Sequence, residues 1–325
     1  MKRSFAAIGL IVGLLSWGAM ASAGTTNQSL VTSAISAAIA SDAQPASLTP
    51  TLASVASPTG AYNAQGASLA AKCSPAIVPA YITKPIPCWF GPASGPVWVL
   101  WGDSNAAAWI PALSYVAKAE KARLAVFVYP GCSSLFVGGI ESGAAVTPTK
   151  CTSFHKALPA AVKAVNPTVV ISATIGMGFS GKQADVAGFA ANWKSTFATI
   201  TGSKTSIKRV LMGTTPNRGG QNIAACLAAA SPKKVLACSP RYYSASWYGT
   251  NYWVYLQRDV ASATASNATL IPVQSLFCDT VSASPNYCPV VVGKYLVTVD
   301  ADHISTAYMN YISPALLEMM KAAGL

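Results

Sequence analysis

Short runs of apolar, often β-branched residues alternate with longer runs of helical character along the chain after Pro96. This pattern predicts strands at Val97–Trp101, Leu124–Val128, Thr168–Ser172, Arg209–Met212 and Thr269–Pro272. It predicts helices near residues 105–121, 155–165, 184–200, 251–265 and 305–323. Strands that alternate with helices form a parallel sheet with helices on both faces. We therefore expect an α/β domain of three layers around a central parallel sheet.

Residues 1–23 have the pattern of a secretory signal peptide. Lys2 and Arg3 precede an apolar stretch over residues 5–20, and the small residues Ala21-Ser22-Ala23 complete a cleavage site. The mature chain should begin near Gly24; an uncleaved anchor is the alternative. No later apolar run reaches the length of a membrane span, which is about 20 residues. We therefore expect a soluble protein that is secreted or periplasmic, and in either case extracytoplasmic.

Residues 24–72 consist mostly of Ala, Ser, Thr, Gly and Gln. Segments with so few large apolar groups rarely bury enough surface to hold one fold. This composition predicts a low-complexity tether or loosely ordered arm before a domain over residues 73–325. Because residues 29–40 have helical character, a short helix packed on the domain is the alternative.

The charge is strongly positive but dispersed. The 325 residues include 22 Lys and Arg against 10 Asp and Glu, a formal net charge of +12. The cations, among them Lys118, Lys204 and Lys234, form no dense basic stripe, which disfavours nucleic-acid binding. Attraction to an anionic surface such as a cell envelope fits this charge. The 52% apolar content can fill a core without a partner subunit, so we expect a monomer.

Eight cysteines follow the predicted signal, and an even number in an exported chain predicts disulfides. Neighbouring cysteines enclose short, loop-like segments that contain Pro, Gly or Ser. The expected pairs are Cys73–Cys88, Cys132–Cys151, Cys226–Cys238 and Cys278–Cys288. A zinc site is not expected, because the chain has no CxxC motif and only two histidines.

Two polar motifs lie where the predicted sheet would bind a ligand. Gly102-Asp103-Ser104 ends the first strand, and ligands bind at the carboxyl ends of parallel strands. Ser104 could be a nucleophile or an ordinary helix N-cap. The second motif, Asp300-Ala301-Asp302-His303, lets Asp300 reach Nδ1 of His303 and leave Nε2 free as a base.

Alone, the Asp300–His303 motif is weak evidence for a catalytic histidine, since a histidine beside an aspartate is more often a surface or capping residue. Asp302 could instead be an N-terminal acid of the last helix. The other histidine, His155, lies near the start of a predicted helix just after Cys151.

Together the two motifs resemble the SGNH (GDSL-like) hydrolase superfamily. The chain is most similar to the extracytoplasmic SGNH domain at the C-terminus of many membrane acyltransferase-3 proteins, which modify bacterial polysaccharides. The resemblance covers roughly residues 73–325. It includes "LWGDSNAAAWIPAL", "YPGCSS", "ANWKSTF", "GTTPN" and "YISPALL". It implies a three-layer, flavodoxin-like fold, with Ser104 as nucleophile, His303 as base and Asp300 as the third triad member. No metal or organic cofactor is implied.

The resemblance also implies an oxyanion hole formed by the N–H groups of Ser104 and Gly131. The family asparagine expected as a third donor is absent from "ISATIGMGFSG", where Thr174 or a backbone N–H could replace it. Asn105 stands where the family usually has histidine. Trp247 belongs to an aromatic cluster over residues 241–255, which could stack on sugars or pack as core or lid. Asn105, Thr174 and Trp247 are therefore candidate substrate-binding residues.

These observations favour an exported serine esterase or O-acyltransferase that acts on an acylated polysaccharide or other glycan, with acetyl as the expected acyl group. The alternative is a non-catalytic glycan-binding or envelope-associated protein on an SGNH scaffold. The retained triad residues favour the enzyme, and the missing asparagine favours the alternative.

Overall fold

The computed structural model describes residues 26–71, 79–136, 147–173, 185–216, 222–230, 234–241, 252–280 and 286–325. The predicted signal peptide, residues 1–23, lies outside these ranges.

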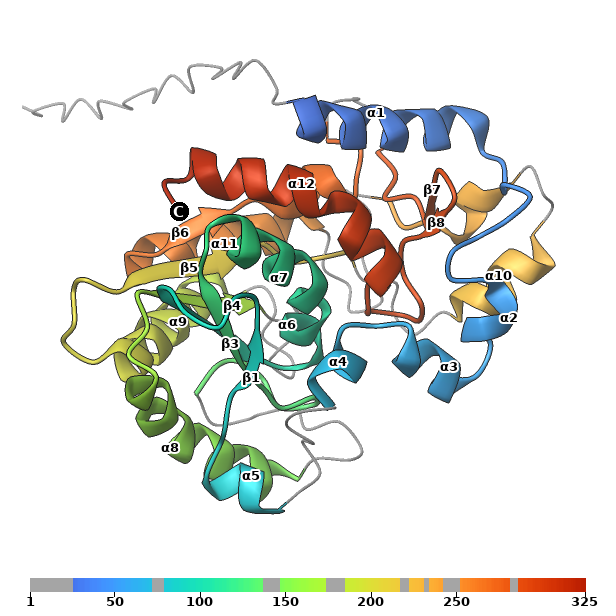
Figure 1. The fold of residues 1–325 in the computed structure, drawn as a ribbon. Coiled ribbons are helices and arrows are strands. Elements are labelled where there is room, and N and C mark those ends of the chain that lie inside the picture. Colours follow the sequence, from blue (N-terminus) through green and yellow to red (C-terminus); the bar gives the residue numbers. More distant parts are fainter. Residues whose placement is uncertain are drawn as a thin grey trace, which may run out of the picture.

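A central sheet of six strands organises the domain (Figure 1). The strands are β1 (Cys88–Phe90), β2 (Val97–Gly102), β3 (Arg123–Val128), β4 (Val169–Ala173), β5 (Lys208–Met212) and β6 (Thr269–Ile271). Their order is β1-β3-β2-β4-β5-β6, in which β2 to β6 are parallel and β1 is an antiparallel edge strand. The five parallel strands have the flavodoxin-like order. The predicted fold class and strands are confirmed; β1, only three residues long, was not predicted.

Helices surround the sheet and fill the N-terminal region. The longer helices are α1 (Thr26–Ser41), α7 (Ile110–Ala119), α8 (Pro148–Ala164), α9 (Val186–Thr201), α11 (Tyr252–Ser266) and α12 (Thr306–Ala322). The shorter ones are α2 (Leu52–Val55), α3 (Pro58–Asn63), α4 (Ala67–Ala71), α5 (Pro79–Thr83), α6 (Ser104–Ala108) and α10 (Ile223–Ala229). Two 3-10 turns (Val235–Cys238, Val273–Leu276) and a small hairpin of β7 (Val291–Val292) and β8 (Tyr295–Leu296) complete the fold. None of these described helices is both long and apolar enough to cross a membrane.

Alternate residues of each strand build two separate apolar layers. In β2, Trp98 and Leu100 pack with α6, α7 and α12 on one face. Val99 and Trp101 pack with α8 and α9 on the other face, and α11 lies along α9. A strand buried on both faces is expected to be almost entirely apolar, as β2 to β4 are apart from Arg123 and Ser172. The sheet is therefore the middle of three layers.

The N-terminal region differs from the loosely ordered arm that its composition predicts and agrees with the alternative, a helix over residues 29–40 that packs on the domain. Residues 26–71 form α1 to α4, and α1 lies alongside α12 (Figure 1). Val31 and Ile35, one turn apart, are buried in the main core, and the alanines beside them allow close approach. At the start of α1, the backbone N–H groups of Asn27 and Gln28 donate to the Glu318 carboxylate of α12 at 3.3 and 3.1 Å. Two buried apolar side chains and the hydrogen bonds to Glu318 thus hold α1 on the domain, although the region has few large apolar residues.

Three of the predicted disulfides are confirmed: Cys132–Cys151, Cys226–Cys238 and Cys278–Cys288. The fourth, Cys73–Cys88, includes Cys73, which lies outside the described residues.

Truncation of Ile35 tests whether α1 belongs to the core. Ile35→Ala removes a side chain that is 1% exposed, so it should lower the free energy of unfolding by about 2–4 kcal/mol through lost burial and a residual cavity. Leu30→Ala in the same helix removes a side chain that is 59% exposed and should change it by less than about 0.5 kcal/mol. Urea unfolding measures both. Equal effects of the two substitutions would show that α1 does not pack on the domain.

Candidate active site

The site begins where β2 ends. Gly102 has φ 145°, a conformation that side chains disfavour. A Cβ there would overlap Ser134 Oγ and would lie 2.8 Å from the Ala173 carbonyl oxygen. Glycine is therefore required because the ends of β2 and β4 and the loop after β3 meet closely at this point.

The turn after Gly102 presents Ser104 at the first position of α6. Asp103 is the N-cap residue, and its Oδ1 accepts hydrogen bonds from the N–H groups of Asn105 at 2.8 Å and Ala106 at 3.1 Å. Acidic N-caps satisfy helix N–H groups in this way. The cap is thus Asp103, which leaves Ser104 partly exposed for another role. Asn105 is buried, at 6% exposure.

A tight loop presents His303 before α12. Thr298 pairs with Ile304, and the Val299 N–H donates to the His303 carbonyl at 3.0 Å. Inside the loop, Asp300 Oδ1 accepts from the N–H groups of Asp302 at 3.1 Å and His303 at 2.8 Å. The Asp300 carboxylate therefore fixes the backbone that carries the histidine.

Helix α12 is capped by Ser305, whose hydroxyl accepts from the Tyr308 N–H at 3.0 Å. The N-cap is therefore Ser305, and the first turn of α12 contains no acidic residue, so Asp302 lies outside this helix.

The structure brings together the three residues predicted as a triad. His303 Nε2 lies 2.7 Å from Ser104 Oγ, although the two residues are 199 positions apart. His303 Nδ1 lies 2.9 and 3.0 Å from the two oxygens of Asp300. Since a carboxylate accepts only, Nδ1 carries the proton and Nε2 is free to accept one from the serine hydroxyl. This arrangement can deprotonate Ser104 as it attacks an electrophile.

A second carboxylate adjoins the same imidazole nitrogen. Asp302 Oδ1 lies 3.3 Å from His303 Nδ1. Burial raises the pKa of Asp302 to about 6; the charge of His303 opposes this shift, and the charges of Asp300 and Asp103 reinforce it. Burial raises the pKa of Asp300 too, but its hydrogen bonds and the charge of His303 outweigh burial and bring this pKa below the usual value.

The three acids act together on His303. Burial alone lowers the pKa of this imidazole, whose side chain is 17% exposed. The hydrogen bond to Asp300 and the charges of Asp300, Asp302 and Asp103 outweigh burial, so the pKa of His303 lies above its usual value of 6.5. The acids thereby stabilise the protonated form of the His303 imidazole.

The loop after β3 is the third component of the site. Gly131 lies in its turn with φ 79° and is partly exposed. Ser134 Oγ donates to the Ala173 carbonyl at 2.6 Å, and the Trp101 indole N–H donates to the Ser134 carbonyl at 3.3 Å. These bonds tie the loop to the ends of β2 and β4 and thus fix the position of Gly131 at the edge of the sheet.

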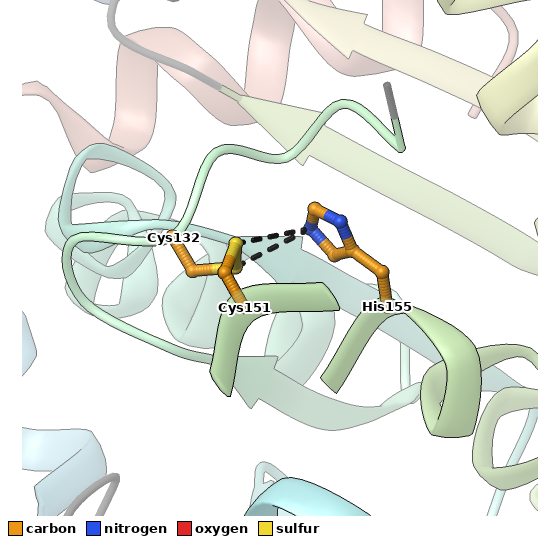
Figure 2. Close-up of side chains that lie close together, drawn as sticks. All are labelled: Cys132, Cys151 and His155. Carbon is orange, nitrogen blue, oxygen red and sulfur yellow. Dashed lines mark hydrogen bonds between the residues drawn. A yellow bond between two sulfur atoms is a disulfide. The ribbon is translucent and has the colours of Figure 1, made fainter. Parts of the chain in front are cut away.

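His155 holds this loop from the side of α8. Figure 2 shows its imidazole beside the Cys132–Cys151 disulfide, with Nε2 at 3.4 and 3.8 Å from the two sulfurs. The same Nε2 lies 2.7 Å from the Ser133 carbonyl, to which it donates. Burial lowers the pKa of His155 to about 4, a shift that this hydrogen bond opposes. His155 is therefore a neutral donor that supports the loop, and Ser104 is paired with the other histidine.

Two groups of potential metal ligands lie within the described parts of the chain. One consists of Cys132, Cys151 and His155, but its sulfurs are already joined in a disulfide. The other consists of Asp300, Asp302 and His303, whose facing atoms already contact one another. Both groups are thus engaged in contacts of their own.

Two predicted substrate-binding residues, Thr174 and Trp247, lie outside the described residues. The residues that sequence reasoning missed are Asp302 as a neighbour of the imidazole, Asp103 as a nearby charge, and Ser134 and His155 as supports of the Gly131 loop. The motif spacing signalled only Asp302, because it adjoins His303; the other contacts depend on how separate strands meet.

The titration of the two histidines tests this electrostatic arrangement. In an NMR pH titration of the imidazoles, His303 should titrate above pH 6.5 and His155 near pH 4. Asp302→Asn should lower the pKa of His303 because it removes a nearby negative charge. Asp42→Asn, which alters a carboxylate bonded to the Leu236 N–H, should leave it unchanged. A His303 pKa at or below 6.5, or one insensitive to Asp302→Asn, would contradict the arrangement.

Comparison with known proteins agrees with this geometry. Residues 72–318 match a family described as "SGNH domain (fused to AT3 domains)". The fold is similar to the periplasmic domain of a lipopolysaccharide acetyltransferase from Salmonella ser. Paratyphi A, with a TM-score of 0.55 and 17% sequence identity. The alignment covers 83% of this chain and 98% of that domain. A search of curated protein sequences returned no match. Because the matched region includes both the Ser104 turn and the His303 loop, the chain belongs to the SGNH-domain family associated with AT3 domains.

Proposed function

We propose that this protein is a serine-dependent O-acyl esterase or O-acyltransferase that acts on acylated carbohydrate outside the cytoplasm. The observation that carries the proposal is the continuous chain of hydrogen bonds from Ser104 through His303 to Asp300. Membership in the SGNH family supports acyl chemistry.

In the first half-reaction Ser104 Oγ attacks the carbonyl carbon of the ester while His303 Nε2 takes the hydroxyl proton. Asp300 holds the imidazole and stabilises its charged form. The tetrahedral intermediate collapses, the bond from the carbonyl carbon to the sugar oxygen breaks, and His303 returns the proton to the leaving alcohol. The acyl group is then bonded to Ser104.

In the second half-reaction an acceptor hydroxyl attacks the acyl carbon and gives its proton to His303. The bond to Ser104 Oγ breaks, and the proton passes from His303 to this oxygen. Water as acceptor makes the protein an esterase; a sugar hydroxyl makes it a transferase. The same residues serve both reactions.

The negative oxygen of the intermediate needs N–H donors. The Ser104 N–H belongs to the first turn of α6, where N–H groups have no acceptor within the helix. Gly131, in the loop fixed by Ser134 and His155, supplies a second donor in this proposal. One such donor contributes about 3 kcal/mol to catalysis, so two account for a substantial part of the rate.

Three lines of reasoning support carbohydrate as the substrate class and an extracytoplasmic location. The three disulfides favour an oxidising compartment. The similar Salmonella domain is the periplasmic part of a lipopolysaccharide acetyltransferase. A net charge of +12 favours an anionic envelope polymer over a neutral one. Acetyl esters of envelope glycans are therefore the first substrates to test.

The proposal predicts that Ser104 reacts with a fluorophosphonate probe. It also predicts that the protein releases or transfers acetyl groups from acetylated polysaccharides or simple acetyl esters. Mass spectrometry detects both the labelled serine and the change in acetylation. Ser104→Ala and His303→Ala should each reduce turnover by about 10⁴-fold or more, because triad residues act as a unit. Asp300→Asn should also be severe. Turnover should rise with pH through the pKa of His303, above 6.5, since only the neutral imidazole is a base.

Asp302→Asn is the matched control for Asp300→Asn. Both aspartates lie near His303 Nδ1, but Asp302 accepts neither loop N–H group that Asp300 accepts, so its loss should change turnover little at pH values above the pKa of His303. Unchanged turnover in the Ser104→Ala protein would refute the proposed nucleophile. Absence of probe labelling together with intact glycan binding would favour the non-catalytic alternative.

A further inference from the structure

The loop between α3 and α4 lies against both halves of the candidate active site. Gly66 is buried against α6, the helix that begins with Ser104. A Cβ on Gly66 would overlap the Ala107 carbonyl oxygen and would lie 2.9 Å from Ala108 Cα. The loop therefore touches the backbone of the nucleophile helix directly, with no side chain between them.

The other side of this loop is bonded to the chain just beyond His303. The Thr306 N–H donates to the Ala64 carbonyl at 2.8 Å, and Gln65 forms an antiparallel bridge with Ser305. Ser305 in turn donates its N–H to the Val297 carbonyl at 2.8 Å, on the strand side of the histidine loop. A displacement of residues 64–66 would therefore move His303 as well as Ser104.

No disulfide between described residues joins the Ser104 turn to the His303 loop, and Ser104 Oγ must remain about 2.7 Å from His303 Nε2. Catalytic groups lose most of their effect when displaced by about 1 Å. We propose that residues 64–66 act as a spacer that sets the separation of Ser104 and His303, with Gly66 as a positioning residue. The absence of a Cβ at Gly66 sets the closest approach of the spacer to α6.

The conformation of Gly66 is not the reason for glycine at this position, because its φ lies outside the left-handed region. Only the missing side chain is needed. Gly66→Ala should therefore shift α6 relative to the His303 loop, while the backbone conformation at position 66 remains one that alanine can adopt.

Gly60→Ala is a matched control. Gly60 lies in α3 of the same region, and a Cβ there would overlap the Ser54 carbonyl oxygen of α2, away from α6. Both substitutions insert one methyl group against a backbone carbonyl. Both should lower the melting temperature, but only Gly66→Ala should slow the reaction of Ser104 with the probe.

The experiment follows covalent labelling of Ser104 by a fluorophosphonate in the full chain, at several probe concentrations and pH values. Gly66→Ala should lower the maximal labelling rate roughly tenfold to a hundredfold with little change in the half-saturating probe concentration. The pH midpoint should stay nearly in place, because Asp300 and Asp302, whose effects on His303 exceed that of Asp103, lie in the same loop as the imidazole. Gly60→Ala should label at the wild-type rate.

Thr306→Pro provides a second test if Gly66→Ala fails to fold. It removes the N–H that binds Ala64 at the first position of α12, where proline is well accepted, and Ser305 before it is already extended. Labelling should again slow with an unchanged pH midpoint.

The inference rests on the proposed function only in requiring that Ser104 reacts. If the wild type is labelled and both Gly66→Ala and Thr306→Pro label at its rate, the spacer role is refuted and the proposed function stands. If the pH midpoint moves toward 6.5, the spacer role is refuted, because the histidine loop itself has loosened. An unlabelled wild type overturns both proposals.

Discussion

The hydrogen bond between Ser104 and His303 constrains much of this fold, because it joins two turns that are 199 residues apart in sequence. The parallel sheet makes this contact possible by bringing the ends of β2, β3 and β4 to one edge. Gly102 lets these ends meet closely, and Ser134 ties them together. The polar contacts of the site therefore depend on apolar packing on both faces of the sheet.

Nearby carboxylates raise the pKa of the His303 imidazole. Three carboxylates act on His303, and they differ in their other contacts: Asp103 caps α6, Asp300 fixes the loop backbone, and Asp302 lies beside Nδ1. Two of them thus combine a structural task with their effect on the base. His155 shows the opposite outcome, because burial without a carboxylate partner keeps it neutral.

Periodicity predicted the five parallel strands and the long helices after Pro96, since each is encoded in one short stretch of sequence. The triad was implied instead by the family resemblance of two separate motifs, whose 199-residue separation shows no contact by itself. For the N-terminal region, composition favoured a loosely ordered arm because it counts apolar residues without regard to where they lie, whereas the helical character of residues 29–40 indicated the packed helix that is observed. Val31 and Ile35 share one face of α1 and are buried in the main core beside α12. Two large apolar residues are therefore enough to hold α1 on a surface that the rest of the domain forms. The effect of the Asp103 charge on His303 and the contacts of Ser134 and Gly66 could not be predicted, because each depends on segments distant in sequence.

The pairing of α1 with α12 also bears on the order of events during synthesis. Asn27 and Glu318 are 291 residues apart, so α1 is made long before the helix that it packs against. Until residues 303–322 are made, Val31 and Ile35 lack the surface of α12, and Ser104 lacks the histidine beside it. The segment from His303 through α12 therefore both covers α1 and brings the imidazole to Ser104.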